Sequence, residues 1–146
     1  MFRRVSSLTR LLPVLLAGCG GGAFASTVTE NSPRPAPDVY QCARSQLKAV
    51  GFSQTSYDEN DQRVTAKKYA YVTRPDVAFR RLVDRLTVEV QPAGSGEAMS
   101  TISVQAATFA ERQTHRGPTE EQERTSETAR QAAQTIADRC GQGKQG

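Results

Sequence analysis

Leu86-Thr87-Val88-Glu89-Val90 is the stretch that decides the fold, because apolar and polar residues alternate through it without a break. A period of two is typical of a strand with one buried face and one exposed face. A second alternating run, Thr101 to Ala110, follows the turn-forming Pro92-Ala93-Gly94-Ser95-Gly96. We expect the two runs to pair as an antiparallel hairpin.

Upstream of this hairpin, helical spacing of apolar residues begins after Asp38, a good N-cap, and continues to Val50. Gly51 is expected to end this helix, with Phe52 as its apolar C-terminal contact. The segments 53–57 and 63–72 flank the turn-rich 58–61 and predict a second hairpin.

Two further helices are expected on either side of the central hairpin. Pro75-Asp76 opens a possible short helix through Arg85. Thr119-Glu120-Glu121-Gln122 fits a capping box, and an apolar stripe then continues to Cys140 before Gly141, which predicts a C-terminal helix.

These elements predict an α+β fold, a small single domain over 38–141 with two terminal helices packed on an antiparallel sheet of about four strands. Residues 142–146 are expected to form a disordered tail. The order helix, hairpin, hairpin, helix, with the phrase Leu47-Lys48-Ala49-Val50-Gly51-Phe52 leading into a strand, faintly resembles helix-grip domains of envelope assembly lipoproteins such as BamC. This resemblance carries no functional residues over.

The N-terminus has the layout of a secretory signal, with cations before a short apolar run over 11–17. The run is too short to span a membrane. Leu16-Ala17-Gly18-Cys19 resembles the bacterial lipobox, which implies a lipoprotein signal peptide over 1–18 and lipid on Cys19. The resemblance further implies a lipid anchor in the cell envelope, on the outer membrane facing the periplasm if the source is Gram-negative, because Gly20 rather than Asp follows the cysteine. The alternative is ordinary cleavage after Ala25, at Ala23-Phe24-Ala25.

Loss of the signal removes Arg3, Arg4 and Arg10 and leaves 16 of the 19 basic residues against 15 acidic ones. A nearly neutral mature chain does not favour nucleic acid as a partner. The pair Lys67-Lys68 and the group Arg80, Arg81, Arg85 are interpreted as solvated faces, with contact to anionic lipid or polymer as the alternative.

Residues 19–37 are rich in glycine, proline and small polar residues, so we expect a flexible tether behind the lipidated cysteine. As a coil, the eighteen residues 20–37 behind Cys19 would span about 23 Å root-mean-square. The domain would then swing near the membrane without resting on it.

Cys42 and Cys140 remain once Cys19 is assigned to lipid, and export places them in an oxidising space. A bridge between them is expected to clamp the two terminal helices. Two buried thiols, or a redox or metal pair, are the alternatives, although no CxxC spacing supports a metal site.

No motif favours an enzyme, and no cofactor is expected. His115 is the only histidine and lies in a polar stretch, so an exposed loop side chain is favoured over a general base. Asp58, Glu59 and Asp61 suggest paired carboxylates or calcium, but the calcium-loop pattern stops after three residues, which favours a solvated turn.

Two functional classes remain. The first is a non-catalytic protein-interaction or scaffold module of the envelope. The second is a binder of a small or polymeric envelope ligand, such as a lipid or glycan, with Tyr57, Tyr69 and Tyr71 as the possible ligand surface. Tyr69 and Tyr71 share one strand face, and the alternative for this strip is a contact between sheet and helix.

Overall fold

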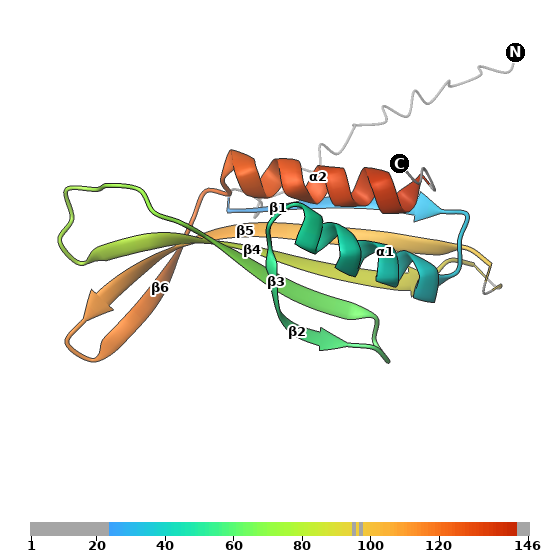
Figure 1. Ribbon diagram of the computed structural model, residues 1–146, viewed down its shortest axis with the longest axis horizontal. Helices are drawn as coiled ribbons and strands as arrows, with labels where there is room; N and C mark the ends of the chain where they lie inside the picture. The colour runs from blue at the N-terminus through green and yellow to red at the C-terminus, as the bar shows by residue number, and fades with distance from the viewer. Residues whose placement is uncertain (1–23, 95, 97, 143–146) are drawn as a thin grey trace, which may run out of the picture.

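The computed structural model describes residues 24–94, 96 and 98–142, and it has two helices packed on a six-stranded antiparallel sheet (Figure 1). The elements in chain order are β1 (Ala25–Ser32), α1 (Ala36–Ala49), β2 (Ser53–Asp58), β3 (Arg63–Ala70), β4 (Phe79–Pro92), β5 (Ser100–Thr114), β6 (Gly117–Glu123) and α2 (Glu127–Gly141). The strands lie in the order β1-β5-β4-β3-β2, and β6 also pairs with β5. The predicted α+β class is correct, but the sheet has six strands instead of about four.

The predicted central hairpin is present as β4 and β5, with Val88 opposite Val104. Both strands are longer than predicted, because their pairing continues to Phe79 opposite Arg112. The prediction of a helix over 75–85 is therefore wrong. The antiparallel ladder with β5 provides the backbone hydrogen bonds of this segment, and β-pairing overrides its helical spacing of apolar residues.

Helix α1 is present where the sequence predicted it, although it begins at Ala36 after Pro35 rather than at Asp38. Gly51 adopts a positive φ of +84° directly after the helix. Its N–H donates to Lys48 C=O at 3.1 Å, and Phe52 N–H donates to Leu47 C=O at 2.9 Å. These two bonds form a Schellman motif, which needs a left-handed residue at the glycine position and buries Phe52 against the helix.

Residues 25–32 form strand β1, so the prediction of a flexible tether over 19–37 is wrong for this segment. The strand pairs with the first half of β5, from Ala25 opposite Ala107 to Ser32 opposite Ser100. A Cβ atom added at Gly141 would lie 2.7 Å from the Glu30 Cβ, which shows how closely the end of α2 approaches β1. These tertiary contacts order a segment whose composition alone predicts a coil.

The prediction of a helix start at Thr119-Glu120-Glu121-Gln122 is also wrong, because this segment lies in β6. It pairs with the second half of β5, from Thr108 opposite Glu123 to Thr114 opposite Gly117. Helix α2 begins later, with Ser126 as the N-cap whose side chain accepts from the Ala129 N–H at 3.0 Å. The strands β1 and β6 are the two that the sequence pattern did not predict.

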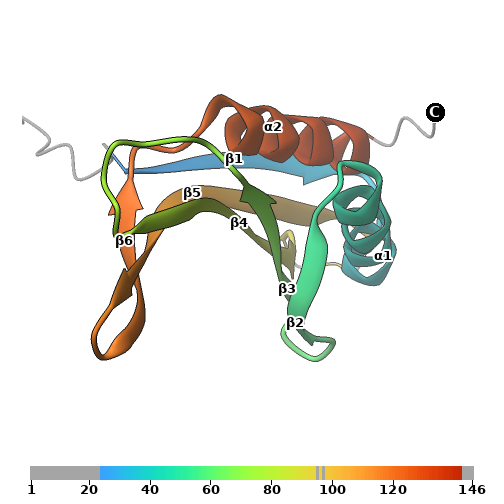
Figure 2. The same ribbon diagram turned by 60° about the vertical axis from the view of Figure 1, so that its left-hand side comes forward.

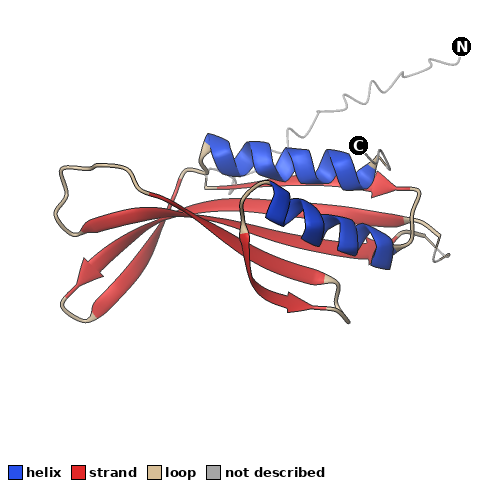
Figure 3. Cartoon of the chain, in the orientation of Figure 1, coloured by secondary structure: helices blue, strands red, loops and turns tan. Residues whose placement is uncertain are grey.

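The core lies between the helices and one face of the sheet (Figure 3). Its largest fully buried side chains come from both helices and from β3, β4 and β5. They are Leu47, Leu86, Ile102, Ile136, Val39, Val64, Val88, Val90 and Val104. The alternation that predicted the central strands assigns their apolar side chains to this layer.

Cys42 of α1 and Cys140 of α2 form a disulfide, as predicted, with their Cα atoms 5.7 Å apart and 98 positions apart in the sequence. The bond joins the two helices side by side on the sheet. Chain entropy assigns a loop of this length a stabilisation of about 4–5 kcal/mol.

Cys19, the signal segment 1–18 and residues 143–146 of the predicted tail lie outside the described residues. Within the described part, no helix is both long enough and apolar enough to cross a membrane.

Candidate functional site

One face of the sheet has no helix over it. Figure 2 shows both helices on the same side, with β2, β3 and β6 bending away from them, so that the uncovered face lies on the inside of the bend. Because strand side chains alternate between faces, the residues between the core positions of β3, β4 and β5 all point to this side. We call it the open face.

Neutral polar side chains cross the middle of the open face in one row. The strand registers place Thr65 opposite Thr87, Thr87 opposite Gln105, and Gln105 opposite Thr27. These four side chains come from four adjacent strands and are all partly or fully exposed. Hydroxyl and amide groups in such a row can donate and accept hydrogen bonds toward anything that lies across the sheet.

Arginines stack on aromatic rings in the next part of the open face. Tyr69, Val83 and Phe109 are direct cross-strand neighbours. The Arg81 guanidinium lies 3.8 Å from the Tyr69 ring centroid, and the Arg85 guanidinium lies 4.4 Å from the Phe109 centroid. Val83 is fully buried although it does not belong to the main core cluster. A small second cluster therefore covers this part of the sheet with cation–π pairs.

Arg81 connects the two tyrosines that the sequence placed together. Its Nη1 donates to the Tyr71 hydroxyl at 3.3 Å, and its Nη2 contacts the Glu111 carboxylate at 3.1 Å. The hydrogen bonds to Tyr71 and Glu111 raise the pKa of Arg81 above its usual value. Arg81 therefore contacts both tyrosines.

Tyr57 does not join them. It lies opposite Val64, whose side chain points into the core, so Tyr57 is on the helix side of the sheet. Its ring lies 4.6 Å from the guanidinium of Arg44 on α1. The predicted surface of three tyrosines is therefore divided between the two faces, with only Tyr69 and Tyr71 together.

A small cleft of about 360 Å³ lies beside these two tyrosines. Its lining comes from the second half of β3 and the residue that follows it, the first half of β2 and the turn before β2. The lining residues are Gly51, Ser53, Thr55, Lys67, Lys68, Tyr69 and Tyr71. Two cations and two phenols, with no acidic residue among them, make this cleft suited to an anionic or hydrogen-bonding group.

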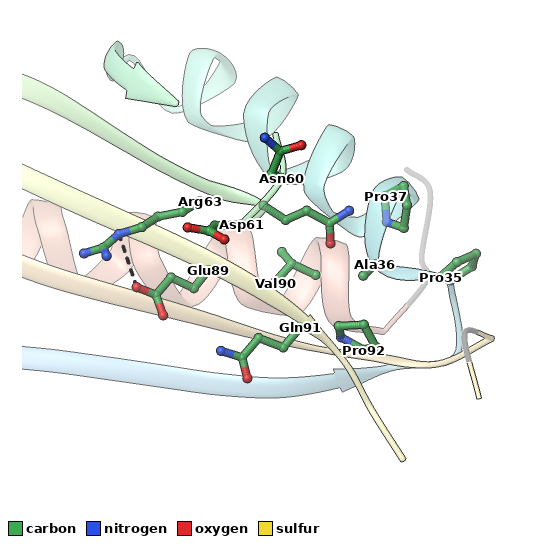
Figure 4. Close-up of a pocket in the computed structure, with 11 residues that line it drawn as sticks. Pro35, Ala36, Pro37, Asn60, Asp61, Arg63, Glu89, Val90, Gln91 and Pro92 are labelled. Carbon is green, nitrogen blue, oxygen red and sulfur yellow. Dashed lines mark ion pairs between the residues drawn. The ribbon is translucent and has the colours of Figure 1, made fainter. Parts of the chain in front are cut away.

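A larger cleft of about 670 Å³ lies at the other end of β3, where α1 begins (Figure 4). Pro35, Pro37 and Pro92 contribute rigid walls, and the Arg63–Glu89 ion pair, at 3.2 Å, lies on its sheet side. This cleft was not predicted from the sequence, because its walls come from three separate turns and strand ends. The prolines at the start of α1 and at the end of β4 are the one sequence feature that marks this part of the fold.

The remaining candidate residues are spread over the surface. His115 lies exposed in the turn between β5 and β6. The Asp58 carboxylate accepts from the backbone N–H groups of Asn60 and Asp61 at 2.9 and 3.1 Å, so it shapes the turn between β2 and β3. Glu59 pairs with Arg44. Within the described residues, no group of three His, Cys, Asp or Glu side chains is placed to hold a metal ion.

No family model matches the chain. A search of curated proteins finds no match either. Among solved structures, the di-domain ARO/CYC BexL from the BE-7585A biosynthetic pathway is similar to this chain with a TM-score of 0.40 and 14% identity. The match covers 59% of this chain and 36% of that one. At this TM-score the likeness carries no argument about fold or function.

Proposed function

We propose that the protein is a lipid-anchored, non-catalytic interaction module of the bacterial cell envelope, and that its open face meets a protein partner. The observation that carries this proposal is the placement of both helices on one face of a six-stranded sheet. The uncovered face is broad and carries exposed side chains from four strands.

Energetics favour a partner for this face. The cation–π pairs of Arg81 and Arg85 present flat, largely preordered groups, which lose little side-chain entropy on binding. Arginine and tyrosine are also the residue types most enriched among those that dominate binding energy at protein interfaces.

The resemblance of Leu16-Ala17-Gly18-Cys19 to the lipobox supports the anchored part of the proposal. A thioether-linked diacylglycerol and a further acyl chain on Cys19 contribute about 0.8 kcal/mol per buried CH₂, so the attachment is effectively permanent. The proposed location is the cell envelope, at the outer membrane facing the periplasm if the source is Gram-negative.

A photo-crosslinking residue placed at Gln105, in the middle of the open face, tests the partner. Gln134, which is exposed on α2, is the matched control position. We expect a discrete protein adduct from Gln105 and none from Gln134 in membrane fractions. Equal crosslinking from both positions, or none from Gln105, would contradict a partner at the open face.

Replacement of Cys19 by Ser tests the anchor separately. The variant is expected to fractionate as a soluble protein and to lose the Gln105 adduct. Intact-mass analysis of the wild type should show an acylated N-terminus at Cys19. An unmodified N-terminus at Ser26 would show ordinary cleavage and exclude the anchor.

A second candidate function is binding of a polymeric envelope ligand such as a glycan. The row of Thr65, Thr87, Gln105 and Thr27 favours it, because hydroxyl and amide groups match the hydrogen-bonding groups of a sugar chain. Titration of the mature Cys19→Ser chain with neutral and acidic oligosaccharides, followed by amide NMR, tests it. Shifts confined to this row would favour the ligand binder over the protein-interaction module.

A further inference from the structure

Strand β3 is longer than the edge strand that covers it. It pairs with β4 along its whole length, from Arg63 to Ala70. Its pairing with β2 stops where Ser53 lies opposite Lys67. In the described part of the chain, no strand lies beside the segment 68–70 on the side away from β4.

The backbone groups of Tyr69 point into this uncovered notch. Alternate residues of a strand direct their N–H and C=O groups to opposite neighbours. Gln62 C=O accepts from the Val90 N–H of β4 at 3.1 Å, and Thr65 C=O accepts from the Thr55 hydroxyl of β2 at 3.2 Å. Backbone groups at odd-numbered positions of β3 therefore face the β2 side, and those of Tyr69 point there, where no described strand pairs with them.

The side chains around the notch give it a positive charge. It opens onto the cleft of about 360 Å³ that Lys67, Lys68, Tyr69 and Tyr71 line. Neither lysine takes part in an ion pair with the described residues. Lys68 Nζ instead lies 5.8 Å from the ring centroid of Phe52.

We propose that this notch receives an extended acidic segment of a partner protein, which adds a short strand to β3 beside Tyr69 while its carboxylates meet Lys67 and Lys68. Strand addition to an exposed sheet edge uses backbone hydrogen bonds for affinity and side-chain clefts for specificity. The inference rests on the proposed protein-interaction function and names the site and the chemistry of the partner.

Three observations favour this occupant. An acidic glycan could pair with the charges of the two lysines, but it has no backbone N–H and C=O groups at the spacing that Tyr69 would bind in a β-ladder. A second copy of this chain would have to supply its own acidic extended segment, Gly117–Glu123, which is already paired as β6. The lack of an acidic lining residue in the cleft matches a negatively charged segment.

The test uses a capped seven-residue peptide, Thr-Thr-Glu-Glu-Glu-Thr-Thr, and the full mature chain carrying Cys19→Ser. Consecutive Glu residues of an added strand point to both faces of the sheet, as Lys67 and Lys68 do. Hydrogen exchange should show new protection at the Tyr69 amide when the peptide is bound. A peptide of the same sequence that is N-methylated along one edge should bind at least about tenfold more weakly, since it cannot pair with β3. Equal binding of both peptides, or no protection at Tyr69, would overturn the proposal.

Two variants separate charge from fold. Lys67→Gln with Lys68→Gln should weaken peptide binding by about tenfold and make it less salt-dependent. Lys48→Gln, on the exposed side of α1, should leave binding unchanged. If the double variant fails to fold, hydrogen exchange at the Tyr69 amide still tests the proposal, because that measurement uses the chain with both lysines unchanged.

Further outcomes separate strand addition from a glycan ligand and from contact at the open face. An acidic hexuronate oligosaccharide that binds with the same lysine dependence, in the absence of peptide binding, would overturn strand addition in favour of a glycan. A Gln105 adduct in cells without peptide binding would overturn only strand addition at β3, because it would leave the open-face interaction in place. Peptide binding at Tyr69 without a protein adduct from Gln105 would contradict only the open-face proposal.

Discussion

At the residue scale, Ser126 has two tasks. Its hydroxyl caps α2 by accepting from Ala129 N–H at 3.0 Å, and it donates to the buried carboxylate of Asp84 at 2.8 Å. Thr108 donates to the same oxygen at 2.6 Å. A cap, a buried acid and the centre of the sheet therefore share one hydrogen-bond network.

Ser126→Ala should lower the free energy of unfolding by about 1–3 kcal/mol, since it removes the cap and one of the two side-chain donors of a buried carboxylate. Thr128→Ala, an exposed change in the same helical turn, is the control and should alter stability by less than about 0.5 kcal/mol. Urea denaturation measures both. Equal effects would show that the network does not stabilise the start of α2.

At the element scale, the strands that the sequence predicted are those with one apolar face. The segments 86–90 and 101–110 lie in the middle of the sheet, where burial imposes alternation. Strand β6, Gly-Pro-Thr-Glu-Glu-Gln-Glu, has no apolar side and poor strand propensity, so no pattern could reveal it. Ion pairs hold it instead, among them Arg85 with Glu120 at 2.7 Å, and such pairs across distant strands leave no local trace.

The alternation of side chains along a strand also decides which parts of the site could be predicted from the sequence. A strand period of two predicted that Tyr69 and Tyr71 share one face. Strand β3 ends at Ala70, before Tyr71, and the two tyrosines instead share a contact with Arg81. Tyr57 could not be placed, because its side depends on the register shift between Gln54 and Ser56, which the sequence does not indicate. The open face and both clefts depend on how separate elements assemble.

Stability at low pH should depend on the contact between β6 and the loop before β4. Arg74 makes two hydrogen bonds to Glu123, one of them 2.7 Å long, and this lowers the pKa of Glu123 below its usual value. A carboxyl whose folded pKa is depressed contributes stability above its unfolded pKa of about 4.3, and that contribution is lost as pH falls through the folded pKa.

Glu123→Gln should therefore reduce the free energy of unfolding most at pH 6–7, and the difference from wild type should narrow as pH falls below about 4. Arg74→Gln should flatten the pH dependence of the free energy of unfolding over the same range, because it removes the guanidinium that lowers the pKa of Glu123. Denaturant titrations at several pH values provide the measurement. A difference that stays constant from pH 7 to 3 would refute the role of this pair.

At the scale of the whole molecule, strand β1 shortens the linker between the domain and its proposed lipid anchor. The predicted tether of eighteen residues would have allowed the domain to swing widely. Because strand β1 begins at Ala25, only six Cα–Cα steps would separate the sheet from the proposed lipid on Cys19. Their extended length is at most about 22 Å, so the proposed anchor would hold the domain close to the bilayer.

The distance between domain and membrane should then respond strongly to linker length. A dye on a cysteine introduced at Gln134, with acceptor lipids in the vesicle, reports this distance through energy transfer for the acylated protein. Insertion of ten Gly/Ser residues between Gly22 and Ala23 lengthens the linker from six to sixteen steps, which raises the root-mean-square reach of a flexible coil from about 13 Å to about 22 Å. The insertion should lower the transfer, while the urea midpoint stays unchanged because the sheet is untouched. Transfer that does not change on insertion would mean that contacts of the domain with the lipid surface, and not the short chain after Cys19, hold it there.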